Sequence, residues 1–183
     1  ADAVITLSGP LSLPSTIEIK GSGNSTIDLA SKYQLSVIDS SDLVMLSNLE
    51  IRNGFAGVGS FVQLARAGLT VLMTDLTVRD MHSTSGAALS DTLGATVNMQ
   101  NVNFINCTND NSIGTTTLAV SAFSTTGYSL TDVSFVNCSQ TKTIAAFIAN
   151  TNAATIVFGG KMVINDDLSN AGSTTTPAAL IFS

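Results

Sequence analysis

The stretch Met99-Gln-Asn-Val-Asn-Phe-Ile-Asn-Cys107 decides how this chain folds, because three close variants of it occur elsewhere in the sequence. The variants begin at Leu46, Met73 and Leu130, and all follow the pattern apolar, any, Asn/Asp, apolar, any, apolar, any, Asn/Asp. The first polar column is Asn48, Asp75, Asn101 and Asp132, the second is Asn53, Asp80, Asn106 and Asn137, and both advance by 27, 26 and 31 residues. A period of this size predicts stacked repeats.

The alternating polarity inside each repeat predicts short β-strands. Because successive side chains of a strand point to opposite faces, we expect the apolar residues of each phrase to stack inward as columns: Leu49 and Ile51, Leu76 and Val78, Val102 and Phe104, Val133 and Phe135. Glu50, Thr77, Asn103 and Ser134 lie between them and should point outward. A strand of small residues follows or precedes each phrase, at 60–65, 86–90, 116–123, 143–149 and 177–182. The sequence therefore predicts an all-β chain with about three strands per repeat.

Composition supports this fold class and excludes several functions. Of 183 residues, 44% are hydrophobic and only 11% are charged, which is unlike a helical protein. The net charge of −6, with seven Lys and Arg, argues against nucleic acid as a partner. No apolar run approaches the roughly 20 residues of a membrane-spanning helix. The start at Ala1-Asp-Ala3 suggests a segment of a longer parent or assembly.

The segment Thr16-Ile-Glu-Ile-Lys-Gly-Ser-Gly23, followed by Ile27-Asp28, resembles the first rungs of right-handed parallel β-helix proteins of the pectin-lyase-like class. With the repeats, this implies a right-handed parallel β-helix, or β-solenoid, of about six rungs with an Asn/Asp ladder. We expect one domain over 1–183: capping rungs at 1–33, regular rungs at 34–165 and a C-terminal rung at 166–183. Phe104-Ile-Asn-Cys107 and Phe135-Val-Asn-Cys138 are similar to repeats of chlamydial polymorphic outer membrane proteins.

A leucine-rich repeat is the main competing fold. Its Asn follows the last apolar residue by three positions, whereas Asn53 and its equivalents follow by two. In a β-helix the two polar columns have a structural explanation, since Asn and Asp tolerate a left-handed backbone at a bend. Copies stacked in register can also pair along the stack.

Cys107 and Cys138 occupy the same slot in consecutive repeats. One rung of separation permits a disulfide, and two buried free thiols fit the same place, so both alternatives stay open. Of three glycosylation sequons, only Asn24 lies in a Gly/Ser turn where we expect a glycan. The other two use Asn106 and Asn137, which as ladder residues are expected to point inward.

The candidate ligand-binding residues are Glu50, Arg52 and Arg79, because the two arginines fall in one outward column with Glu50 beside them. They could clamp an acidic sugar, or an arginine could act as the base of a lyase. The next rungs place Ile105 and Val136 in that column. These rungs also supply no cluster of carboxylates that could hold the calcium ion of such a lyase. His82, the sole histidine, has no nucleophile phrase around it.

Other chemistry finds little support. Asp166-Asp167 lacks the phrases that accompany the paired aspartates of polygalacturonases, and the threonine runs at 115–117 and 174–176 do not recur at the repeat period that an ice-binding face needs. Two cysteines and one histidine are too few for a zinc site. We expect no catalytic residues, metal or cofactor.

The functional hypothesis is a non-enzymatic extracellular or cell-surface β-helix module, structural or adhesive. Its partners would be like modules, other structural or surface proteins, or glycans, because the outward residues are small and mostly uncharged. The alternative is a carbohydrate-active β-helix, an acidic polysaccharide lyase or a glycan-binding protein, that uses the face of Arg52 and Arg79.

Overall fold

The structure is a computed structural model that describes residues 3–13, 16–37, 42–57, 60–65, 67–84, 88–91, 93–109, 116–122, 127–140, 145–150, 155–165 and 180–182. These residues form strands and turns, with no helix among them. Asp166-Asp167, Thr115, the threonine run at 174–176 and most of the predicted C-terminal rung lie outside the described residues.

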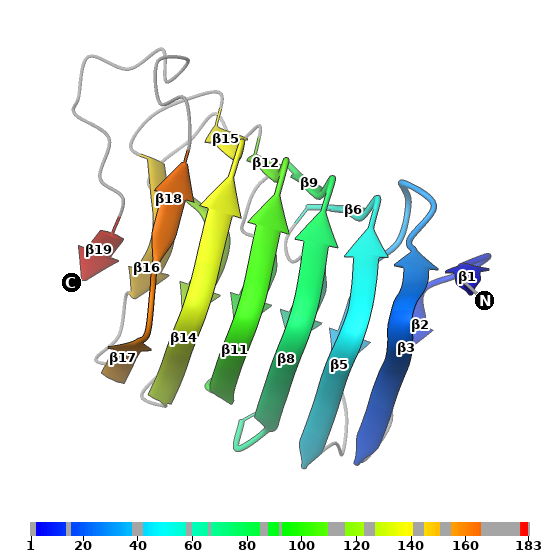
Figure 1. The fold of residues 1–183 in the computed structure, drawn as a ribbon, viewed down its shortest axis with the longest axis horizontal. Helices are drawn as coiled ribbons and strands as arrows, with labels where there is room; N and C mark the ends of the chain where they lie inside the picture. Colours follow the sequence, from blue (N-terminus) through cyan, green and yellow to red (C-terminus); the bar gives the residue numbers. More distant parts are fainter. Residues whose placement is uncertain are drawn as a thin grey trace.

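The described strands form three parallel sheets that wind into a β-solenoid, as the repeats predict (Figure 1). The first sheet contains β1 (Val4–Thr6), β3 (Ile17–Asp28), β5 (Leu43–Arg52), β8 (Thr70–Arg79), β11 (Thr96–Ile105), β14 (Gly127–Val136), β17 (Thr155–Gly159) and β18 (Val163–Asn165). The second contains β2 (Leu11–Ser12), β4 (Leu35–Val37), β7 (Val62–Leu64), β10 (Leu89–Asp91), β13 (Thr116–Ala122), β16 (Ala145–Asn150) and β19 (Leu180–Phe182). The third contains β6 (Phe55–Ala56), β9 (His82–Ser83), β12 (Thr108–Asn109) and β15 (Ser139–Gln140).

The number of coils is smaller than the sequence predicts. A strand in all three sheets occurs in the coils that start with β5, β8, β11 and β14, which makes about four complete turns rather than about six. The coils before and after them are described in only two of the sheets, because the third sheet begins at β6 and ends at β15. The all-β parallel solenoid is confirmed, and the predicted small-residue strands form its second sheet.

The polar ladder residues form the corners of the coil. Asn48, Asp75, Asn101 and Asp132 have φ between 52° and 55°, and Asn53, Asp80, Asn106 and Asn137 have φ between 52° and 58°. Strand pairing skips the first column: Gln100 pairs with Thr74 and Val102 with Leu76, while Asn101 and Asp75 have no place in the register. One left-handed residue therefore bends the chain while both flanking segments stay paired.

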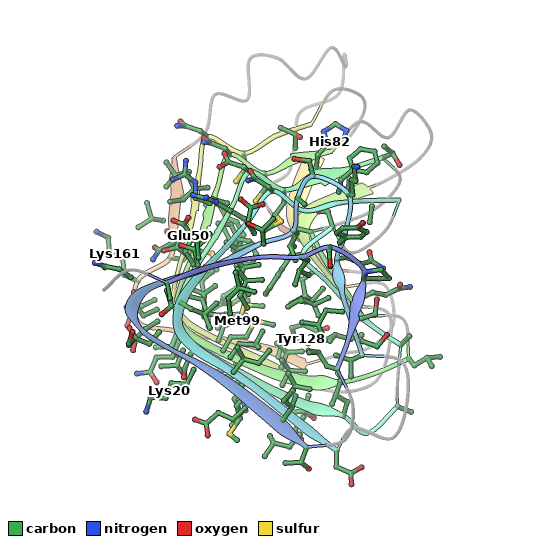
Figure 2. The ribbon with its side chains drawn as sticks, turned by 90° about the vertical axis from the view of Figure 1, so that its right-hand side faces the viewer. Lys20, Glu50, His82, Met99, Tyr128 and Lys161 are labelled. Carbon is green, nitrogen blue, oxygen red and sulfur yellow. The ribbon has the colours of Figure 1, made fainter. Side chains whose placement is uncertain are left out.

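The left-handed corner also shifts the alternation of side chains by one residue. In β5, Val44 and Leu46 point inward before Asn48, and Leu49 and Ile51 point inward after it. All eight predicted columnar residues are at most 4% exposed, and Phe104 and Phe135 stack with ring centroids 5.3 Å apart. Viewed along the stack, Met99 and Tyr128 point into the interior, and Lys20 and Lys161 point away from it (Figure 2).

Glycines replace the ladder residue where the first column ends. Gly160 has φ of 62° and follows Gly159, which pairs with Thr131 beside Asp132. A side chain at Gly160 would collide with the Asp132 carboxylate. At the other end Gly21 accepts a hydrogen bond from the Asn48 amide, 3.1 Å, through its carbonyl oxygen. A side chain there would collide with the Asn48 backbone, so Gly21 requires glycine.

We predict that a β-branched residue at the Asn101 corner destabilises the fold more than glycine does. Asn101→Gly keeps the left-handed backbone and loses one hydrogen bond, at a cost of about 1 kcal/mol. Asn101→Val adds backbone strain for a total of about 2–3 kcal/mol. Urea unfolding followed by circular dichroism measures both, with Asn98→Val, at an exposed outward residue of the same strand, as the near-neutral control. An equal decrease in the free energy of unfolding for the two Asn101 variants would contradict the role of Asn101 as a left-handed corner.

Candidate functional site

The predicted ligand residues come together on the outer face of the first sheet, as part of a larger charged cluster. Arg52 pairs with Arg79 in the register of β5 and β8, and Glu50 pairs with Thr77 two residues before. The Glu50 carboxylate lies 3.7 Å from Arg52 and 3.9 Å from Arg79. The sequence thus identified three residues that are neighbours in space.

Each arginine also has a carboxylate of its own. Arg52 Nε donates to Asp28 Oδ2 at 3.0 Å, and Arg79 Nε donates to Asp80 Oδ2 at 2.8 Å. Three carboxylates therefore surround two guanidinium groups, and the charged cluster formed by Asp28, Glu50, Arg52, Arg79 and Asp80 has a formal charge of −1. The arginine side chains remain 35% and 40% exposed, but both point their Nε donors at neighbours within the protein.

The sequence analysis assigns Asp80 only to the ladder, and it misses one further member of the charged cluster, Asp28. Its side chain is 14% exposed, and it accepts from Arg52, from the Asn53 amide at 3.0 Å and from the Ala30 N–H at 2.9 Å. Burial raises the pKa of Asp28, but the hydrogen bonds from Ala30, Asn53 and Arg52 outweigh it, so the net pKa is lowered. Alignment of Ile27-Asp28 with Ile51-Arg52 would have placed it in the arginine column.

The charged cluster ends where the sequence predicts. The column that contains Asp28, Arg52 and Arg79 continues through Ile105 and Val136. In the described ranges there is no group of three His, Cys, Asp or Glu residues that could hold a metal ion. The cluster therefore spans the first coils, with ion pairs both within a layer and between neighbouring layers.

The Asn/Asp ladder pairs amides with carboxylates. Asn101 donates to Asp75 at 2.7 Å and Asn106 donates to Asp80 at 3.0 Å. The predicted inward orientation of the ladder is wrong: Asn137 is exposed and Asn106 is only half-buried. A left-handed corner turns its side chain out of the interior, so the inward-pointing argument against the sequons at Asn106 and Asn137 does not hold. Asn24, the predicted glycan site, is exposed.

A shallow polar hollow of about 260 Å³ lies beside the charged cluster. It crosses the outer face of β3, β5 and β8 and is lined by Gly23, Asn24, Thr26, Leu49, Glu50, Asp75 and Thr77. Its two ionisable side chains are both carboxylates, so it repels anions and offers hydroxyl and amide groups to neutral polar ligands.

His82 belongs to β9 and its ring stacks on Phe55, with centroids 5.2 Å apart and an interplanar angle of 7°. Its Nδ1 lies 2.9 Å from Thr108 Oγ1. Phe55 is 42% exposed, and the register places His82 between Phe55 and Thr108. His82 is thus part of an aromatic stack on the third sheet, two residues after Asp80 of the charged cluster.

Cys107 and Cys138 are free thiols in the structure, 0% and 2% exposed. Cys107 Sγ lies 3.9 Å from the Val78 carbonyl oxygen, and Cys138 Sγ lies 3.6 Å from that of Phe104. A hydrogen bond with Cys138 and burial raise the pKa of the Cys107 thiol well above its ordinary value. The disulfide stays a prediction for oxidising conditions.

Comparisons of the chain with protein-family models, with curated proteins and with solved structures give no match. No helix in the described part of the chain is long and apolar enough to cross a membrane.

We predict that Asp28 contributes a pH-dependent part of the stability. Its pKa is lowered on folding, so the stabilisation is present above the unfolded pKa of about 3.9 and is lost as pH falls through the folded pKa. Urea unfolding between about pH 2 and 7 measures the free energy of unfolding. As the pH falls, this free energy should decrease less for Asp28→Asn than for the native chain. Asp42→Asn, an exposed aspartate outside the charged cluster, is the control. Parallel pH curves for Asp28→Asn and the native chain would contradict the role of Asp28.

We predict that the cysteines of the reduced protein react with a thiol reagent only after unfolding. The thiols are buried and the pKa of Cys107 is raised, so little thiolate is available. Ellman's reagent, with and without denaturant, checks this, and prompt labelling of the folded protein would contradict it. Protein prepared under oxidising conditions and denatured without reductant shows whether the pair forms a disulfide, since labelling is then lost.

Proposed function

We propose that this β-solenoid is a non-enzymatic, structural or adhesive module of the extracellular space or cell surface, related to the pectin-lyase-like β-helices. In this proposal it packs against like modules, other surface proteins or glycan. The observation that carries it is the internal pairing of the charged cluster: both of its arginines, Arg52 and Arg79, already have opposite charges at 2.8–3.9 Å.

The state of the arginines weighs against a polysaccharide lyase. A lyase base must face the sugar to accept its proton, and an arginine whose Nε donates to a protein carboxylate is oriented toward that carboxylate instead. Arg52 donates to Asp28 and Arg79 donates to Asp80. An acidic sugar that approached them would also meet Glu50, whose negative charge opposes binding.

The outer face of the central coils supports a packing role. Two outward columns cross β5, β8, β11 and β14: Met45, Leu72, Asn98, Ser129, and Ser47, Thr74, Gln100, Thr131. They contain no charged residue and form a broad surface with a shallow hollow lined by Leu72, Thr74, Asn98, Gln100, Ser129 and Thr131 among others. Such a surface costs less to desolvate than a charged one, and its amides and hydroxyls can hydrogen-bond a second protein or a glycan.

The test combines an activity screen with an assembly measurement. We expect no unsaturated uronate from polygalacturonate, alginate or hyaluronan, with or without calcium, and we expect the purified protein to associate as its concentration rises in analytical ultracentrifugation. Electron microscopy of native material should show neighbouring chains on the solenoid. Release of uronate that Arg52→Lys or Arg79→Lys abolishes would overturn the proposal in favour of a lyase, and a monomer with no partner or glycan bound would contradict the packing role.

A further inference from the structure

One half of the outer face of the first sheet is a strip that carries very little charge. It lies before the first polar column and consists of two columns of outward side chains that cross β3, β5, β8, β11, β14 and β17. The first column is Glu18, Met45, Leu72, Asn98, Ser129 and Val157, and the second is Lys20, Ser47, Thr74, Gln100, Thr131 and Gly159. Only β3 contributes charged residues to this strip, one to each column.

The two charges of the strip belong to Glu18 and Lys20. Both residues are exposed, and Lys20 points away from the interior (Figure 2). In the described part of the chain neither forms a salt bridge, whereas Glu50, Arg52 and Arg79 on the other half of the face are paired internally. Two opposite charges on one strand can be matched by the same pair in reverse order on another strand.

A two-fold axis parallel to the stack brings the strip onto itself in that reversed order. When the axis lies between the two columns, the first column of each copy faces the second column of the other, layer by layer. Glu18 then faces Lys20 of the second copy, and Lys20 faces Glu18 of the second copy. In the middle of the strip Asn98 faces Gln100 of the second copy, so two amides meet that can each donate and accept hydrogen bonds.

The charges also select this alignment over its alternatives. With the axis over the first column, Glu18 would face Glu18 of the second copy, and with the axis over the second column, Lys20 would face Lys20. Both alignments place like charges opposite each other. With the two stacks antiparallel, both charges of β3 would face uncharged residues of β17. The charged pair therefore specifies the direction and the offset of a second copy.

We propose that two copies of this chain form a symmetric dimer through this strip, with their stacks parallel and Glu18 of each copy paired with Lys20 of the other. The inference rests on the proposed packing role and specifies its partner, surface and register. The interface is isologous, because both copies use the same patch, and it closes at two copies.

The size of the strip sets the strength of this dimer. Layers about 4.8 Å apart and columns about 7 Å apart make a narrow contact. It is smaller than the roughly 800 Å² per partner of a standard stable complex. Dimer formation should therefore be weak and should depend on protein concentration.

The test reverses each charge in turn. Glu18→Lys leaves two ammonium groups on the strip and Lys20→Glu leaves two carboxylates, so each variant meets like charges in its own dimer. Each should dimerise at least about tenfold more weakly than the native chain, because repulsion replaces attraction at two symmetric positions. The double variant Glu18→Lys/Lys20→Glu restores opposite charges and should dimerise as the native chain does. An equimolar mixture of the two single variants should form a heterodimer.

Sedimentation velocity over a concentration series gives the dimer dissociation constants, at about 0.1 M salt, where the Debye length is about 10 Å. A fluorescent label on one single variant identifies the heterodimer, and circular dichroism verifies that every variant is folded. Lys32→Glu is the matched control, because it makes the same change of charge as Lys20→Glu at an exposed lysine between β3 and β4. It should dimerise as the native chain does.

Three results would overturn the inference. If the native chain dimerises and neither charge reversal weakens it, copies pack through another surface, and the proposed packing role stands without this dimer. If the mixed single variants form no heterodimer, the pairing of Glu18 with Lys20 is wrong. If the native chain stays monomeric over the whole series, there is no such dimer, and binding of a glycan or a different protein remains the test of the proposed function.

Discussion

The left-handed backbone of the Asn/Asp corners is the constraint on which this solenoid depends. A strand that must turn around a narrow core has to bend sharply without giving up the hydrogen bonds on either side. One residue with φ near 55° does both at each corner, and it shifts the side-chain alternation so that the apolar residues on both sides stay inward. Asn and Asp are the residues other than glycine that adopt this conformation most readily. The Asn and Asp positions of the repeated phrase therefore mark the corners at which the chain turns.

The order of amides and carboxylates along the stack follows from electrostatics. Neighbouring coils are about 4.8 Å apart, and two like charges at such a distance repel by about 1 kcal/mol in water and several times more near a protein surface. In the first column Asp75 and Asp132 are separated by Asn101, and in the second Asp80 lies between Asn53 and Asn106. Each described amide–carboxylate pair replaces that repulsion with a hydrogen bond to a charged acceptor.

Much of this architecture could be predicted from the sequence, because the spacing of the repeats shows which residues of neighbouring strands lie side by side. The spacing of the phrase predicted the parallel stack, the inward columns and the corner role of the polar residues. Two features do not follow from the repeat spacing. The outward direction of side chains such as Asn137 depends on the backbone conformation of the corner and not on alternation. Asp28 joins the arginines through a register that contains a bulge between Lys20 and Ser25, so the repeat period misses it, and only the match of Ile27-Asp28 to Ile51-Arg52 points to its column.

The two ends of the first polar column are closed by the backbone in different ways. At the C-terminal end Gly160 keeps the left-handed corner without an amide, and the Lys161 N–H donates to Asp132 Oδ1 at 2.8 Å. At the other end the Asn48 amide donates to the Gly21 carbonyl oxygen at 3.1 Å. In the middle of the stack the neighbouring ladder side chain supplies such a partner, as Asp75 does for Asn101. Stability in a stack of this kind is a sum of contacts between neighbouring layers, so the two backbone partners let the column end with its last amide and its last carboxylate hydrogen-bonded.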